Sequence, residues 1–406
     1  GRQTLDLDES VYSKSRSIAS KKTSLDQYRR RHDEAAGSTI EGNEVVIRAG
    51  QDLNMRGSNA VSDGLTVLAA GNDVNITAAE NTYADHEFHE RKRSGLSGGF
   101  KDGVLSVGVG KSSQKLNQDD ASTSLTVSQV GSITGDTAII AGNNLTTEAA
   151  VLATGGDMTP QGRNVSLNAA HTASQSDSRM EAKQSGVSAS ITVNPFEAAK
   201  ASYDRNMQGS GYSGSVVGKT IQGGDAIGKA IYAATTPVVF TAGRQKSSES
   251  RHSEGTQAVV TSVSAQGDLN IIATDGNIKS EGAKLAAEGN ALLSATESIE
   301  LGFARDTAAQ SGERKRSGFS IDNREVIPFG TFNDRSEAQG SLDKATGTQL
   351  SAGGAAVLQA KKADIGILGS SIAAQDDVTL IAGRDINIRS TQNSQNQSER
   401  QTTSGI

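Results

Sequence analysis

The sequence of 406 residues has no cysteine, no tryptophan and only 4 prolines, and aromatic residues make up only 3% of it. Without cysteine, the chain has neither a disulfide framework nor a thiolate metal site. Large aromatic side chains supply much of the buried area in globular cores, so the interior here must be built from Val, Ile, Leu and Ala. Turns fall mainly to glycine, of which there are 45.

Long hydrophobic runs and an excess of basic residues are also missing. No apolar run approaches the roughly 18 to 20 residues that a membrane-spanning helix needs. The net charge of −6 gives no basic footprint for nucleic acid, so no nucleic-acid partner is expected. The chain starts at Gly1 without Met or a signal peptide, and it stops inside a repeat at Ile406. We therefore expect a piece of a longer protein, with localisation signals outside it.

What the sequence does contain is a recurring turn, Ala-Gly-x-Asp/Asn-aliphatic-Asn/Thr, which is typical of a solenoid. Clear copies begin at Ala49, Ala70, Ala141 and Ala382. Neighbouring copies are about 21 residues apart, which suits one coil of a parallel β-helix with three short strands at roughly 3.3 Å per residue. Eight or nine coils stacked at about 4.8 Å would form a shaft of roughly 40 Å.

Period-2 alternation after each turn predicts which side chains face the interior. Val74 and Ile76 should point inward and Asn75 outward. The same alternation places Val165, Leu167, Leu269, Ile271, Ile386 and Ile388 inward and Ser166, Asn270 and Asn387 outward. The Asp or Asn of each turn is expected to stabilise its own bend by bonding back to the local backbone.

Polar excursions between the coils share a Ser-Gly pair followed by alternating residues, as at Gly95, Gly186 and Gly318. This pattern predicts antiparallel hairpin arms, and the sequence leaves open whether they pack on the shaft or extend freely. We expect an all-β fold, a right-handed parallel β-helix with protruding antiparallel β-hairpin arms. The expected coils are 38–80, 133–170, 262–304 and 349–390; the expected arms are 81–132, 171–261 and 305–348, with a partial arm at 1–37 and the start of another at 391–406.

The middle arm carries an extra stretch, 194–244. Within it, 196–203 predicts a short helix, and 226–240 is apolar but interrupted by Gly228 and Pro237. This stretch is either a local hydrophobic cap on the shaft or an element that contacts a membrane or a partner.

The turns and the Ser-Gly arms together resemble the haemagglutinin repeats of large exoproteins secreted by the two-partner route. That family includes filamentous haemagglutinin and the contact-dependent growth inhibition effectors. The resemblance implies a right-handed β-helical filament that is secreted to the exterior of the bacterial outer membrane, with an outer-membrane secretion partner for the full-length protein. It also implies a non-enzymatic segment that meets the target-cell outer membrane or a surface receptor and helps carry a downstream C-terminal toxin across that membrane. The alternative is an adhesin shaft that binds host or neighbouring-cell surfaces.

Three basic runs, at 29–31, 91–93 and 314–316, recur at matching places in the arms, and the candidate contact residues come from the second and third of them. They are Arg91, Lys92 and Arg93 in one arm and Arg314, Lys315 and Arg316 in another. One interpretation is a set of solvated charges that keep hairpin edges from aggregating. The other is contact with anionic lipopolysaccharide or phospholipid headgroups.

No pattern in the chain predicts catalysis, a cofactor or a metal. His86 and His89 lie beside Asp85 and Glu87, but no third ligand recurs at the matching place in the other arms. The segment 214–220 resembles the end of a phosphate loop, yet Ser213 stands where that loop requires glycine. The turn carboxylates are explained by their turns, and no Ser/His/Asp spacing or unique acid pair is present. We therefore predict that the segment is not an enzyme.

Overall fold

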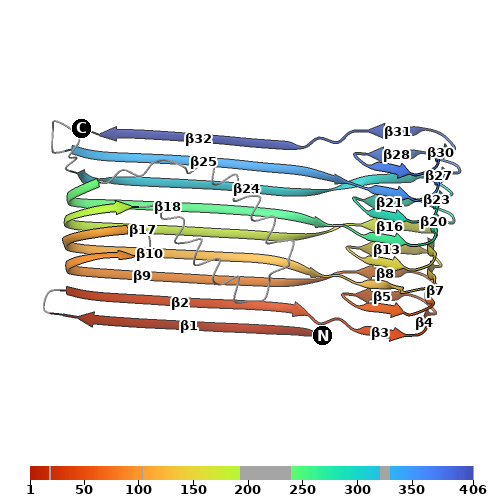
Figure 1. Cartoon of the computed structure of the whole chain (residues 1–406), viewed down its shortest axis with the longest axis horizontal. Helices are drawn as coiled ribbons and strands as arrows, with labels where there is room; N and C mark the ends of the chain where they lie inside the picture. The colour runs from red at the N-terminus through yellow and green to blue at the C-terminus, as the bar shows by residue number, and fades with distance from the viewer. Residues whose placement is uncertain (18–19, 102–103, 193–238, 321–329, 406) are drawn as a thin grey trace.

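The computed structural model describes residues 1–17, 20–101, 104–192, 239–320 and 330–405, which form strands and turns without any helix. The expected helix at 196–203, the segment 213–220 and most of the apolar stretch 226–240 lie outside these residues. Short strands wind into a parallel β-helix, and long strands extend away from it as one antiparallel sheet (Figure 1). The prediction of an all-β, parallel β-helix fold with antiparallel hairpin arms is confirmed.

The shaft has three walls, and in each wall one strand per coil pairs in parallel with the equivalent strand of the next coil. Wall one contains β3 (Thr39–Gly42), β6 (Asn59–Ser62), β11 (Gln129–Ser132), β14 (Val151–Thr154), β19 (Ser262–Ala265), β22 (Lys284–Ala287), β26 (Gln349–Ala352) and β29 (Ser371–Ala374). Wall two contains β4 (Val45–Ala49), β7 (Thr66–Ala70), β12 (Thr137–Ala141), β15 (Met158–Gly162), β20 (Leu269–Ala273), β23 (Ala291–Ala295), β27 (Ala356–Ala360) and β30 (Val378–Ala382). Wall three contains β5 (Leu53–Arg56), β8 (Val74–Thr77), β13 (Asn144–Glu148), β16 (Asn164–Asn168), β21 (Ile278–Glu281), the start of β24 (Ile299–Ser320), β28 (Ile365–Leu368) and β31 (Ile386–Arg389).

Strand β11 belongs to the shaft, whereas the boundary that we predicted at 132 places it in an arm. Its sequence, Gln-Val-Gly-Ser, contains a single aliphatic residue, so the alternation that marks the other shaft strands is weak here.

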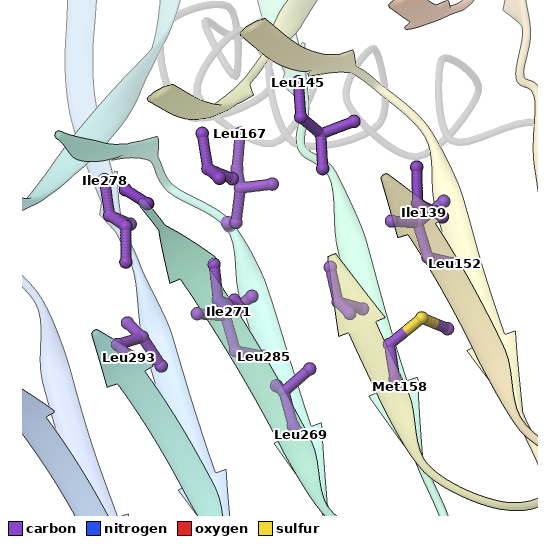
Figure 2. Close-up of a cluster of buried hydrophobic side chains, with 14 of the residues drawn as sticks. Ile139, Leu145, Leu152, Met158, Leu167, Leu269, Ile271, Ile278, Leu285 and Leu293 are labelled. Carbon is purple, nitrogen blue, oxygen red and sulfur yellow. The ribbon is translucent and has the colours of Figure 1, made fainter. Parts of the chain in front are cut away.

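The shaft interior consists of aliphatic columns with one residue per coil. One column in wall three runs Leu53, Val74, Leu145, Val165, Ile278, Ile299, Ile365 and Ile386. Figure 2 shows a cluster of the buried side chains between the walls. Val74, Ile76, Val165, Leu167, Leu269 and Ile271 are fully buried, which confirms the predicted inward positions. Ile386 and Ile388 are 45% and 69% exposed, because among the described strands β31 pairs with β28 and with no second neighbour.

The turn carboxylates and amides differ from the expectation of local bends, because they bridge neighbouring coils. Asp73 accepts a hydrogen bond from the backbone N–H of Asn144 at 2.9 Å, and Asp52 accepts one from the N–H of Asp73 at 3.1 Å. The same bond forms at the corner between walls one and two: Asp157 accepts from the backbone N–H of Asp268 at 2.8 Å, and Asp268 accepts from the backbone N–H of Asn290 at 2.7 Å. The sequence motif therefore records a ladder between coils, which satisfies backbone donors where the wall strands end.

Nine long strands form the arms and pair with each other in chain order. They are β1 (Arg2–Arg16) with β2 (Ser20–Ala35), β9 (Ala79–Lys101) with β10 (Val104–Thr126), β17 (Ala170–Thr192) with β18 (Val239–Val259), β24 with β25 (Gly330–Gly347), and the single strand β32 (Ser394–Gly405). We number these arms one to five. Neighbouring arms also pair, through β2–β9, β10–β17, β18–β24 and β25–β32. The arms therefore extend from the shaft as one continuous sheet along the longest axis of the molecule (Figure 1).

The arms fit side by side because they leave only every second coil. Each outgoing strand continues a wall-three strand, and the coils between them instead turn through a residue of positive φ: Gly57 (54°), Ala149 (49°), Gly282 (65°) or Gly369 (59°). Two coils advance the shaft by about 9.6 Å, and a hairpin of two strands occupies the same width. The strand spacing of the shaft and of the arm sheet therefore match, and neighbouring hairpins meet at hydrogen-bonding distance.

Ala149→Gly should stabilise the fold, because Ala149 holds a left-handed conformation that its three equivalents assign to glycine. Relief of the left-handed strain of about 1–2 kcal/mol, less the entropic cost of glycine, leaves an expected gain of about 0.5–1 kcal/mol. The gain is measured as a shift in the urea midpoint. The reverse change, Gly282→Ala, should destabilise more strongly, since its Cβ would lie 2.6 Å from the Thr346 carbonyl oxygen. A midpoint lowered by Ala149→Gly would contradict this account.

Candidate interaction surface of the arm sheet

The two basic runs that supply the candidate contact residues lie at the same level of the arm sheet. Register connects Arg91 on β9 to Arg316 on β24 through Gln114, Ala182 and Ser247. Because successive residues of a strand face opposite sides, Arg91 and Arg93 share one face of the sheet with Arg314 and Arg316, and Lys92 and Lys315 share the other. We call these the arginine face and the lysine face.

Structure adds basic residues at this level that the sequence reading missed. On the lysine face, Lys92, Lys183 and Lys246 lie in one row across β9, β17 and β18. Lys246 lies on β18, the strand of arm three that runs back toward the shaft, and no Ser-Gly pair follows it in the sequence. Only the register therefore places Lys246 beside Lys92 and Lys183. We use the name basic belt for eight of the basic residues at this level: Arg91, Lys92, Arg93, Lys183, Lys246, Arg314, Lys315 and Arg316.

Several residues of the basic belt have acidic or aromatic partners. Lys92 contacts Glu90 at 2.6 Å and Lys315 contacts Glu313 at 2.7 Å, and each lysine lowers the pKa of its glutamate. The Arg316 guanidinium lies 5.7 Å from the Phe332 ring centroid, and burial lowers its pKa. The two lysine side chains are about half exposed, so the contribution of these pairs to stability is small, and the ammonium groups stay accessible to an anionic surface.

Just beyond the basic belt, a line of glycines crosses the sheet. Gly95, Gly110, Gly186 and Gly243 are in direct register on four successive strands. Gly95 and Gly186 have φ of 112° and 129°, values that side chains disfavour. A Cβ on Gly110 would lie 2.1 Å from the Ser185 carbonyl oxygen. The glycine line is therefore required by backbone conformation and by close strand approach, which explains the Ser-Gly pairs at Gly95 and Gly186. The third pair, at Gly318, lies outside this line, because Gly318 pairs with Gln245, two residues nearer the shaft than Gly243.

The strand residues beyond the glycine line are almost free of charge. In the described segments 96–101, 104–109, 187–192 and 239–242, Lys101 is the one ionisable residue. Register places Leu96, Val109, Val187 and Ala242 in one row, while the adjacent row contains Ser97, Gly108, Ser188 and Thr241. The sequence of the tips thus alternates between apolar and small polar rows, whereas the sheet nearer the shaft is rich in charge.

Cross-strand His–Asp pairs link strands of the charged part. His86 Nδ1 lies 2.5 Å from Asp119, and His89 Nδ1 lies 2.7 Å from Asp26. His86 and His89 fall on opposite faces of β9, so they do not converge on one ion. Among the described residues, no group of three or more potential ligands is arranged to hold a metal.

His252 and Asp177 should make the β17–β18 pairing pH-dependent. Their hydrogen bond, 2.7 Å long, raises the pKa of His252 and lowers the pKa of Asp177. The histidine contribution is complete below about pH 6.5 and is lost as pH rises through its raised pKa; the aspartate contribution is present above about pH 3.9 and is lost as pH falls through its lowered pKa. Amide exchange in β18 from pH 5.5 to 8 should show this loss in the native chain and not in His252→Gln. His171→Gln, at an exposed site on β17, is the control, and an unchanged pH profile in His252→Gln would refute the assignment.

A shallow polar trough of about 440 Å³ crosses the lysine face over β10, β17, β18, β24 and β25. Its lining residues come from three consecutive rows of the register; the outer two have their side chains on the lysine face, and the row between them contributes Ser178, Arg251, Gly312 and Ala338. One outer row is Asn117, Arg179, Ser250, Glu313 and Glu337, and the other is Asp119, Asp177, His252, Ser311 and Gln339. The trough is hollow because serines occupy β18 and β24 at its centre, between longer charged side chains. Sequence reading missed it because its residues come from arms two, three and four.

The fold defines this chain as a repeat-built β-helical shaft that carries a sheet of arms. Comparison with known proteins shows the family to which the chain belongs. The family model described as Hemagglutinin repeat matches residues 19–187, 242–324 and 329–406. The chain belongs to the hemagglutinin repeat family, and the resemblance read from the turns and arms is confirmed. In the part of the chain that the structure describes, no helix is long and apolar enough to cross a membrane.

Similar curated proteins are far longer than this chain. It is 27% identical over 332 residues to the tRNA nuclease CdiA of Escherichia coli strain STEC_O31, covering 76% of this chain and 10% of that protein. It is 27% identical over 371 residues to the 16S rRNA endonuclease CdiA of Enterobacter cloacae, covering 91% and 9%. It is 30% identical over 285 residues to the tRNA nuclease CdiA-2 of Burkholderia pseudomallei strain 1026b, covering 64% and 9%. The chain therefore spans about a tenth of these relatives. No solved structure matches it.

Proposed function

We propose that this chain is a non-enzymatic delivery segment of a large secreted bacterial exoprotein, displayed at the cell surface. Its arm sheet engages the outer membrane of a target cell and helps carry a downstream C-terminal toxin across it. The relatives named as nucleases support this proposal, because the matched tenth of each is a repeat region and leaves most of the protein for other tasks. The full-length protein would need an outer-membrane secretion partner, and no nucleic acid is a partner of this segment.

The observation that carries the proposal is the division of the arm sheet at the glycine line. Arginine and lysine lie at the boundary, and beyond it the described strand segments are nearly uncharged with period-2 alternation. Basic residues near an anionic membrane surface contribute about 1 kcal/mol each, and apolar rows beyond them suit the hydrocarbon boundary.

The basic belt residues Arg91, Lys92, Arg93, Arg314, Lys315 and Arg316 are proposed headgroup contacts. Replacing Arg91 and Arg93 by glutamine should weaken binding to anionic vesicles about thirtyfold at low salt, from the loss of two contacts of about 1 kcal/mol each. The basic run 29–31 on β2 lies nearer the shaft than the predicted matching place, because Arg29 pairs with His86 and Arg31 with Ala84. The same change at Arg29 and Arg31, which lie on the lysine face, is the control for the loss of two charges and should have a smaller effect. Equal losses would indicate a general charge effect instead of a localised contact.

A tip variant tests the membrane proposal directly. Residues 96–109 are replaced by a short Gly/Ser loop, which shortens arm two at the glycine line and leaves its charged part. Binding to outer-membrane vesicles should fall at least about tenfold, while far-UV circular dichroism shows that the shaft is retained. Folding without membrane association in either version would favour the adhesin shaft, for which the polar trough is the supporting observation.

A further inference from the structure

The polar trough on the lysine face is long enough for an extended polymer. It crosses five neighbouring strands, and four steps of about 4.8 Å give a length of roughly 19 Å. A linear chain lying across the strands would contact lining residues along its whole length.

The carboxylates of the trough restrict the charge of the occupant. Asp119 and Asp177 lie at one end, Glu313 and Glu337 lie at the other, and their fixed partners are His86, His252, Lys315 and Arg335. These four acids outnumber the two arginines of the lining, Arg179 and Arg251, and so disfavour a polyanion such as nucleic acid or a uronic acid chain, because like charges repel.

Hydrogen-bond donors and acceptors line the rest of the trough. Ser250 and Ser311 occupy the centre, Arg179 is a donor, and Gln339 and Asn117 present both donor and acceptor atoms. No aromatic or large aliphatic residue is among the lining residues, so an apolar peptide or acyl chain would find no complementary surface. Sugar hydroxyls donate and accept together, as the serine and amide groups do, and they match this mixed lining along its whole length.

We propose that the trough binds a neutral or amine-bearing glycan chain, with carboxylates and Arg179 holding hydroxyl or ammonium groups and the two serines forming the floor. The site exists only when arms two, three and four pair side by side, since each supplies part of both outer rows. This inference goes beyond membrane engagement by the tips and does not depend on it: the trough lies on the shaft side of the glycine line.

Calorimetric titration of the whole chain with four named probes tests the proposal. Maltoheptaose is the neutral glycan, a chitosan heptamer carries amines, oligogalacturonate is anionic, and heptalysine stands for a basic peptide. Maltoheptaose or the chitosan heptamer should bind and oligogalacturonate should not. Binding by heptalysine alone would overturn the glycan assignment in favour of a cationic peptide, and the absence of binding at millimolar concentration would overturn the site.

Two variants locate the binding. Ser250→Tyr fills the trough and should weaken glycan binding at least about tenfold, whereas Ser248→Tyr, two residues away on the same strand and face but outside the lining, should change it less than about twofold. Asp177→Asn keeps the side-chain shape and should weaken the chitosan heptamer more than maltoheptaose. Equal effects of both tyrosines would refute the location. Vesicle binding of these variants should remain unchanged, so a failure of this site is distinguishable from a failure of membrane engagement.

Discussion

Deleting the plain coil Gln129–Ala150 should destroy the pairing of arms two and three, although each strand of both arms remains in the chain. β17 would then leave the shaft one coil above β9, at the level that β10 occupies in the native sheet. Two outgoing strands separated by about 4.8 Å leave no room for the returning strand between them. The β10–β17 ladder from Val104 to Ser122 would be lost, and amide protection in it should fall by about 100-fold or more.

Deleting 129–261 is the matched control, because it removes two coils together with arm three. The join places β19 on β6 and brings β24 beside β10, at a spacing of two coils per hairpin. This variant should fold with a continuous arm sheet and a shorter shaft, and protection in β10 should stay near its native value. If the variant lacking Gln129–Ala150 kept β10 and β17 protected, the matching of coil and strand spacing would not be what holds the arms together.

The shaft was largely predictable from sequence because its constraints are local and repeated. One aliphatic residue per coil, as at Leu53 and Val74 or at Leu145 and Val165, is visible as a period of about 21 residues. The hairpins were predictable from the alternation that follows the Ser-Gly pairs at Gly95 and Gly186. The role of the turn residues was less accessible, because a local Asx bend and a bond from Asp73 to the next coil have the same sequence signature.

Lateral pairing of the arms and the sites it creates could not be read from the sequence. Asp119, Asp177 and His252 are distant in the chain, and their shared row depends on the register of two separate ladders. Slipping either ladder by one residue would place them on opposite faces. Thr261 and Thr348 were also missed: they are fully buried where arms re-enter the shaft, and their hydroxyls donate to the carbonyls of Asn168 and Gly302.

Ile76→Ala should cost about 2–5 kcal/mol of unfolding free energy, the usual range for truncating a buried isoleucine without collapse of the site. Ile76 is fully buried on β8 and lies in a column between Met55 and Thr147 of the adjacent coils. Walls hydrogen-bonded on both sides cannot close around the cavity without breaking their ladders, which favours the upper part of that range.

Ile388→Ala is the control, because Ile388 occupies the position in β31 that Ile76 occupies in β8 and belongs to the same column. Ile388 is 69% exposed, because β31 pairs with β28 alone, so its truncation should cost less than about 0.5 kcal/mol. Denaturant unfolding followed by circular dichroism measures both, and amide exchange in β5, β8 and β13 separates local from global loss. Equal costs at the two positions would mean that the column contributes through strand propensity and not through burial. A large cost at Ile76 alone would show that each interior residue is stabilised by the coils on both sides of it. This stabilisation is the property that lets the shaft hold a sheet of arms at fixed spacing.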